Sequence, residues 1–98
     1  MIALFGHAES FDYFRVGGTD SFFRRLVRGI LERRKAQITG IFYGASVERE
    51  VVPLPGFICR YMHSFGKALE ELDALQPEHV VTTYLLPGDR FRYAMFRR

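Results

Sequence analysis

The chain has 98 residues, of which 48% are hydrophobic and 26% charged, and a formal net charge of +3. This composition predicts one folded domain, residues 1–98, and the mild excess of arginine permits an anionic ligand without requiring nucleic acid. The single cysteine, Cys59, excludes an internal disulfide. With no apolar run long enough to span a bilayer and a strand directly at the N-terminus, we expect a cytoplasmic protein.

The sequence opens with a predicted strand and a long loop. Residues 2–5 are apolar on both sides, which is typical of a strand buried inside a parallel sheet. Residues 6–20 form the loop, which contains the pair Gly17-Gly18. Glycines let a backbone approach a ligand closely, and the N–H groups at the start of the following helix favour an anion such as phosphate. Gly17, Gly18 and Thr19 are therefore candidate substrate-binding residues.

A basic amphipathic helix is predicted over residues 21–34, with Ser21 or Asp20 as its N-cap. Its apolar side is needed for the core, and its other side carries several arginines. We expect this arginine side to be a solvated helix face, with peripheral contact to acidic membrane lipids as the alternative.

The remainder of the chain predicts four more strands and two more helices. A second strand is followed by a short edge strand, because prolines end that segment early. Ser64 is the expected N-cap of the second helix. In chain order, these elements are expected at residues 36–43, 50–52, 57–62, 65–75, 79–86 and 89–98, the last being a helix that starts without finishing.

This alternation of strands and helices fits two folds. The first is an α/β fold with a three-layer, Rossmann-like parallel sheet in the strand order 3-2-1-4, the short edge strand not being counted. The second is the split βαββαβ sandwich, which has the same order of elements along the chain. The apolar first strand and the glycine pair after it favour the first fold, since ligands of open α/β sheets bind at the carboxyl ends of the strands.

The titratable residues suggest no catalytic or metal site. His7, at the end of the first strand, is the histidine best placed for a functional role, whereas the spacing of His63 and His79 fits no metal motif. Glu9 and Asp12 lie in the long loop, but nothing pairs them as acid and base. We therefore expect no catalytic residue, no metal and no cofactor in this chain, and we add His7 to the candidate substrate-binding residues.

Two stretches resemble a known enzyme family. GGTDSFFRRLVRGIL resembles the loop and helix after the first strand of family 4 retaining glycosyltransferases, which have the two-domain GT-B fold. Gly17 and Gly18 match the family's glycine pair, and Leu26 and Leu31 match its apolar helix positions. ALEELDALQPEHVVTTYLLPG resembles a later helix, proline and apolar strand of the family. Residues 34–37 depart from the pattern, because family members usually carry Gly-His there.

The resemblance implies that the chain is a truncated N-terminal domain, the incomplete acceptor-side half of a GT-B fold. Such an enzyme transfers a sugar from a nucleotide-sugar donor to an acceptor with retention, usually without a metal, and Gly17 and Gly18 would face the donor. The donor-binding domain is absent from these residues, so the chain alone is expected to be inactive. Its open fourth strand and unfinished last helix predict self-association.

An alternative function remains open at this point. The split βαββαβ fold would make the chain a small binding module for RNA or a small ligand, with Phe42, Tyr61 and Tyr84 as stacking residues on an open sheet face. Neither middle strand carries the glycine-aromatic consensus of RNA-recognition strands. Strand direction separates the alternatives, because the first strand has parallel neighbours in the transferase fold and antiparallel ones in the module.

Overall fold

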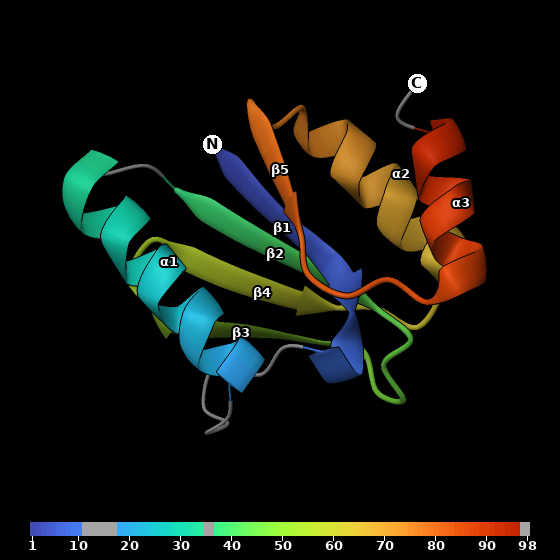
Figure 1. The fold of residues 1–98 in the computed structure, drawn as a ribbon, viewed down its shortest axis with the longest axis horizontal. Coiled ribbons are helices and arrows are strands. Elements are labelled where there is room, and N and C mark those ends of the chain that lie inside the picture. Colours follow the sequence, from blue (N-terminus) through green and yellow to red (C-terminus); the bar gives the residue numbers. More distant parts are fainter. Residues whose placement is uncertain (11–17, 35–36, 97–98) are drawn as a thin grey trace.

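The protein is described by a computed structural model that covers residues 1–10, 18–34 and 37–96. These residues form one five-stranded sheet in the order β3-β4-β2-β1-β5 (Figure 1). Its strands are β1 Ile2–His7, β2 Ile38–Tyr43, β3 Arg49–Leu54, β4 Phe57–Tyr61 and β5 His79–Thr82. A short 3-10 helix, η1, and three α-helices accompany them: η1 Ala8–Ser10, α1 Gly18–Arg34, α2 Phe65–Leu75 and α3 Pro87–Phe96.

The α/β class is confirmed, and the four strands of the expected order, β4, β2, β1 and β5, lie side by side in parallel. The sheet as a whole is mixed, because the short edge strand β3 joins it as a fifth, antiparallel member. β1 pairs in parallel with both β2 and β5, and β2 pairs in parallel with β4, but β3 is antiparallel to β4. The antiparallel pair has a local cause: only Pro55 and Gly56 connect the two strands, and so tight a turn can join only antiparallel neighbours. Gly56 has a φ of 87°, which suits glycine in such a turn. The mixed sheet is compatible with a Rossmann-like fold.

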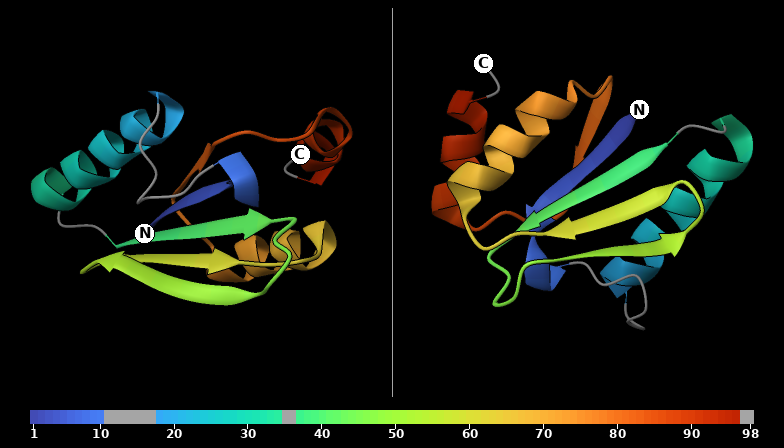
Figure 2. Two further views of the ribbon diagram at one scale, coloured as in Figure 1. Left: turned by 90° about the horizontal axis from the view of Figure 1, so that it is seen from below. Right: turned by 180° about the vertical axis from the view of Figure 1, so that it is seen from behind.

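Alternation along the strands divides the core into two clusters, one on each face of the sheet. α1 packs on one face and α2 on the other, which makes three layers (Figure 2). The cluster beneath α1 includes Leu4, Val27, Ile38, Phe42, Phe57 and Cys59. The cluster beneath α2 includes Ala3, Phe5, Ile41, Tyr43, Leu69 and Leu72. Cys59 is fully buried, as expected for a cysteine that packs as a small apolar residue.

The split βαββαβ alternative is wrong, because β1 has parallel neighbours on both sides. The stacking residues expected on an open sheet face are not available either. Phe42 is 0% and Tyr61 6% exposed, since both lie in the cluster beneath α1. Tyr84 is 46% exposed but lies in the segment after β5, outside the sheet. The sheet therefore offers no aromatic platform for bases at these three positions.

Two helix starts and one strand end differ from the sequence prediction. α1 begins at Gly18, so Asp20 and Ser21 lie inside the helix and neither is its N-cap. β5 ends at Thr82, four residues earlier than expected, although the Thr83 N–H and the Tyr84 carbonyl still hydrogen-bond to β1. α3 then begins at Pro87, which suits the first helical position because its missing N–H would have no partner there.

The prediction for α2 is confirmed at both ends. The Ser64 side chain accepts a hydrogen bond from the Lys67 N–H, so Ser64 is the N-cap. The helix ends at Leu75, and Gln76 closes it in a left-handed conformation with a φ of 49°. Pro77 follows directly, which explains why the helix cannot continue.

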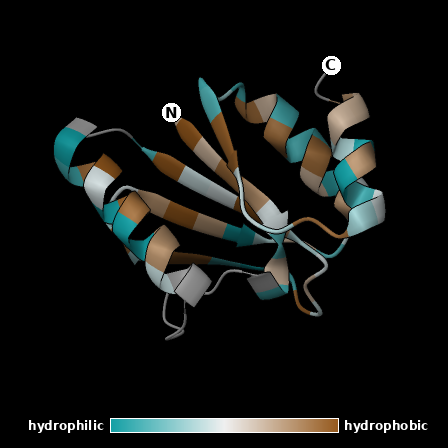
Figure 3. Ribbon diagram, in the orientation of Figure 1, coloured by the Kyte–Doolittle hydropathy of each residue, from teal (hydrophilic) through white to brown (hydrophobic). Residues whose placement is uncertain are grey.

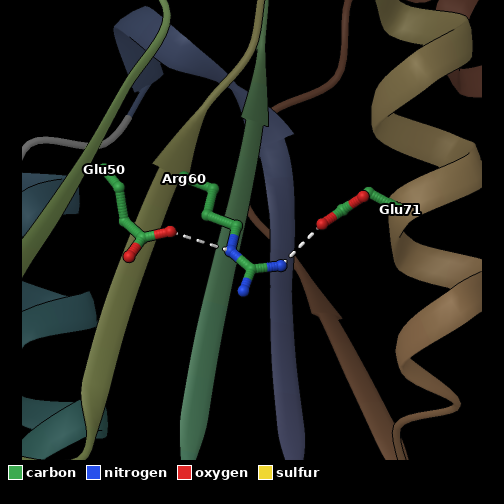
Figure 4. A network of polar contacts seen from close by, with 3 residues as sticks. All are labelled: Glu50, Arg60 and Glu71. Atoms are coloured by element: carbon green, nitrogen blue, oxygen red, sulfur yellow. Dashed lines mark hydrogen bonds and ion pairs between the residues drawn. The ribbon is translucent and has the colours of Figure 1, made fainter.

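An ion-pair network ties α2 to the edge of the sheet (Figure 4). Arg60 of β4 contacts Glu50 of β3 through its Nε, 3.2 Å from the carboxylate, and Glu71 of α2 through its Nη1, 2.6 Å away. One guanidinium therefore links two strands and a helix. The three side chains are 32%, 56% and 39% exposed, so water weakens each contact.

α3 is held by few contacts and leaves much apolar surface outside. Its Tyr93 ring stacks on Phe5, but no residue of α3 is fully buried. Phe91 is 69% and Met95 51% exposed. This surface is consistent with the expected self-association, which stays a prediction. Among the described helices, none is both long and apolar enough to cross a membrane.

Candidate functional site

The carboxyl ends of the parallel strands are the first place to look for a site in this fold. After β1 the chain passes to α1 on one face, and after β5 it passes to α3, which packs with α2 on the other face. Ligands of open α/β sheets bind where the connections after two neighbouring strands go to opposite faces of the sheet. α1 runs back along the sheet, so its first turns lie nearer these carboxyl ends than its last turns do (Figure 2).

His7 closes β1 at this edge and is held by its neighbours. Its backbone N–H donates to the Tyr84 carbonyl at 2.8 Å, and its Nδ1 accepts the Glu9 N–H at 3.3 Å. Because Nδ1 accepts, the neutral ring carries its proton on Nε2. The ring stands edge-on to Tyr43, with 5.2 Å between centroids. Its Nε2 lies 2.6 Å from where a Cβ on Gly44 would be, so only glycine fits there.

The neighbouring loops after β2 and β4 are tied to each other. The N–H groups of Gly44 and Ala45 donate to the carbonyls of His63 and Met62. The His63 ring nitrogen Nδ1 lies 2.9 Å from the Ala45 carbonyl, and its backbone N–H donates to Glu48. His63 therefore has a structural role, in agreement with a spacing that fits no metal motif.

Tyr43 anchors the start of α3 beneath the same edge. Its hydroxyl accepts the Leu86 N–H at 3.1 Å and hydrogen-bonds to the Asp89 side chain. Burial raises the pKa of Tyr43 to about 12, and the negative charge of Asp89 acts in the same direction, while the bond from Leu86 opposes both. The phenol is therefore protonated at neutral pH and serves as a structural hydrogen-bonding group.

The glycine pair is only partly placed by the structure. Gly17 lies outside the described residues, and so do Phe11, Tyr13 and Phe14 of the same loop. Gly18 is the first residue of α1, and Thr19 is the second. The free N–H groups at this helix start can therefore come from these two residues. His7 does not line the cavity that adjoins the first turns of α1.

That cavity has a volume of about 310 Å³ and is lined by Ser21, Arg24, Arg25 and Arg28. The Arg24 Nη2 donates to the Ser21 hydroxyl at 3.0 Å, which fixes the guanidinium across one helical turn. The Arg24 Nε is buried and has no hydrogen-bond partner among the described residues. A buried donor without a partner is costly, and a bound acceptor group would satisfy it.

The arrangement can bind an anion, but it provides no acid–base pair. The four lining residues carry three guanidinium groups and one hydroxyl, and none is a carboxylate. In the described parts of the chain, no three histidine, cysteine or acidic side chains gather as metal ligands would.

Sequence reasoning placed the site at the glycine pair and treated the arginines as a solvated face. The clustering of Arg24, Arg25 and Arg28 within five residues, in the first half of the predicted helix, was the available signal. It was not decisive, because the same spacing occurs on ordinary solvated helices. The buried Arg24 Nε, which distinguishes the two cases, depends on packing that no sequence pattern displays.

Comparisons with known protein families, with curated proteins and with solved structures found no match to this chain. The resemblance to glycosyltransferases therefore enters only as part of the proposal that follows.

Proposed function

We propose that the first three turns of α1 bind the phosphate groups of a small molecule. The observation that carries this proposal is the cavity lined by Ser21, Arg24, Arg25 and Arg28, with its buried and unpartnered Arg24 Nε. Guanidinium groups suit phosphate because their planar N–H forks match its oxygens. The N–H groups at the helix start and the helix dipole favour the same negative charge.

The ligand that we propose is a nucleotide-sugar donor. The resemblance of Gly17-Gly18 and the following helix to family 4 glycosyltransferases implies this class, and the α/β sheet is compatible with the Rossmann-like half of such an enzyme. In that reading the chain is the acceptor-side portion of a GT-B transferase. The N–H groups of Gly18 and Thr19 and the three guanidinium groups would stabilise the charge that develops on the departing diphosphate. The acceptor is unassigned.

A titration followed by amide and guanidinium NMR signals tests this proposal. The probes are UDP-glucose, GDP-mannose and inorganic pyrophosphate, each added to the purified chain. We expect shifts at Gly18, Thr19 and the Arg24 Nε–H, and the shifts should shrink as salt concentration rises. Arg24→Ala should weaken binding about tenfold, the usual loss for a hydrogen bond to a charged group. The matched control is Arg90→Ala, since Arg90 is an exposed arginine of α3.

Each arm of the titration has a defined meaning. Binding of pyrophosphate but of neither nucleotide sugar supports the phosphate site and contradicts the donor assignment. Vesicles that contain acidic phospholipids provide a further arm, because a lipid phosphate shares the same chemistry. Vesicle binding that depends on Arg24, without nucleotide binding, would identify the ligand as the phosphate of a membrane lipid. Equal weakening by Arg24→Ala and Arg90→Ala would show that only net charge matters, which would overturn the site.

A further inference from the structure

A second and larger hollow lies between α1 and the open edge of the sheet. It has a volume of about 710 Å³ and we call it the α1–β5 groove. Its floor is apolar, and its walls come from the middle of α1 and from the amino ends of two strands. The lining residues are Ile2, Arg25, Leu26, Gly29, Ile30, Arg33, His79, Val80 and Val81.

The groove marks a place where the sheet lacks cover. Strands paired in parallel are normally covered by helices on both faces. β5 is the edge strand and pairs in parallel with β1, yet its Val81 is only partly buried and lies at the border of the cluster beneath α1. Figure 1 shows α1 lying along the far side of this face from β5. The uncovered strip beside α1 is therefore where a further helix would complete the layer.

α1 presents a ridge to this groove in which glycine stands between two arginines. Arg25, Gly29 and Arg33 are four residues apart and so lie in one line along the helix, with about 12 Å between the first and the last. A Cβ added to Gly29 would meet nothing within 4 Å. Glycine inside a helix costs about 1 kcal/mol relative to alanine, and no contact within the described residues requires it here. Its use is explained if another backbone packs closely against this ridge.

The charge of the groove decides which partner fits. Among the described residues, the charged or titratable ones that line it are Arg25, Arg33 and His79, so the partner should carry acidic residues about two helical turns apart. A second copy would have to offer its own exposed apolar helix, α3. Exposed Arg90 and Arg92 of that helix outnumber its one acidic residue, Asp89, which pairs with Arg92, so its net charge has the same sign as the groove. Like charges at close range disfavour this pairing.

We propose that the α1–β5 groove docks an acidic amphipathic helix of a partner protein. The apolar side of that helix covers Leu26, Ile30 and Val81, and its backbone approaches α1 at Gly29. Acidic residues on its flank pair with Arg25 and Arg33. This mode of recognition is the general one in which an amphipathic helix fills an apolar groove. The groove shares Arg25 with the phosphate cavity and is otherwise lined by different residues.

Three synthetic peptides test this inference on the purified chain. The first is a helix-forming peptide with leucine on one side and glutamate on its flanks. The second replaces glutamate by lysine, and the third carries a central proline that prevents a continuous helix. We expect only the first to bind, with shifts at Leu26, Gly29 and Val81. The other two should bind about tenfold more weakly or not at all, because one loses charge complementarity and the other the helix.

Variants of the ridge make the assignment specific. Arg33→Glu and Gly29→Leu should each weaken binding of the acidic peptide about tenfold. The first reverses a charge that the peptide needs, and the second fills the groove with a side chain. Arg28→Glu is the matched control, because Arg28 does not line this groove but lines the phosphate cavity. Arg28→Glu should leave peptide binding unchanged and weaken pyrophosphate binding. Arg33→Glu should weaken peptide binding and leave pyrophosphate binding unchanged.

The remaining outcomes count against the inference. Equal binding of the glutamate and lysine peptides, or no binding of the glutamate peptide, overturns it. Binding of the proline peptide at full strength would indicate an extended partner instead of a helix. If groove signals shift with protein concentration and no peptide is present, a second copy is the occupant, and light scattering would show the matching increase in mass.

Discussion

The two helices that cover the sheet use their polar residues in different ways. The polar groups of α2 serve the fold: Ser64 caps the helix, and Glu71 binds Arg60 of the sheet. α1 also buries apolar side chains, Phe23 and Val27, but several of its arginines line two hollows (Figure 3 shows its two-sided hydropathy). Arginines of α1 line both the cavity and the groove, which is why we place both proposed sites on this helix.

The largest expected effect on stability comes from Leu72→Ala in α2, which tests this contrast between the two helices. Leu72 is fully buried beneath the helix, so the substitution leaves a cavity and should destabilise the protein by about 2–5 kcal/mol. Chemical denaturation measures the loss. At temperatures where the variant is folded, pyrophosphate binding should be unchanged. A weakened phosphate site in the folded variant would mean that the two faces are coupled, contrary to our comparison.

High pH should weaken the α2 face through Tyr43. Its pKa is about 12 in the folded protein, and tyrosine in an unfolded chain has a pKa near 10. Because the folded value is the higher one, stability should be constant below pH of about 10 and fall as pH rises from there to about 12. Denaturation midpoints measured across this range check the effect. Tyr43→Phe is the control, since it removes the ionising group and should remove this part of the pH dependence.

A pair of serine substitutions compares the two helices directly. Ser64→Ala removes the N-cap of α2 and should cost about 1 kcal/mol. Ser21→Ala lies inside α1, where alanine is the better helix former, so its effect on stability should stay within about 0.5 kcal/mol. Thermal or chemical denaturation distinguishes the two. A loss at Ser21 as large as that at Ser64 would show that the first turn of α1 depends on the contact with Arg24.

The smallest expected effect is a gain in stability. Gly29→Ala should stabilise the protein by somewhat under 1 kcal/mol, roughly the difference in helix propensity, because the added methyl group meets nothing. The same variant should bind the acidic peptide no better than the original chain. Destabilisation would indicate that the groove is already occupied by part of this chain.

The elements could be predicted where the local sequence alone decides them. Ser64 caps α2 because its side chain is close to the Lys67 N–H whatever the tertiary fold is. Pro77 stops the helix because proline has no N–H to donate and its ring clashes with the preceding turn. At the start of α1 local reasoning failed. Ser21 is as good a cap as Ser64 on propensity, yet the helix begins three residues earlier at Gly18.

The site was harder to predict than the elements. Sequence patterns indicated His7 and the glycine pair, which are recognisable by type and position. They did not show that Ser21 and three arginines line an open cavity, or that Arg60 reaches from β4 to Glu71. Such contacts join residues on different turns or different elements, and their distances follow from packing angles that no single segment contains.

The sequence by itself determined the α/β class, the two-sided burial of β1 and the basic amphipathic character of α1. These properties follow from hydrophobic periodicity, which the chain carries at every position. Only the tertiary structure decided that β3 joins the sheet antiparallel, that α1 lies away from β5, and that Arg25 and Arg33 face an uncovered strip of sheet. Periodicity tells which side of an element is buried. It does not tell where a sheet ends or which surface stays uncovered, because these depend on how all the elements pack together.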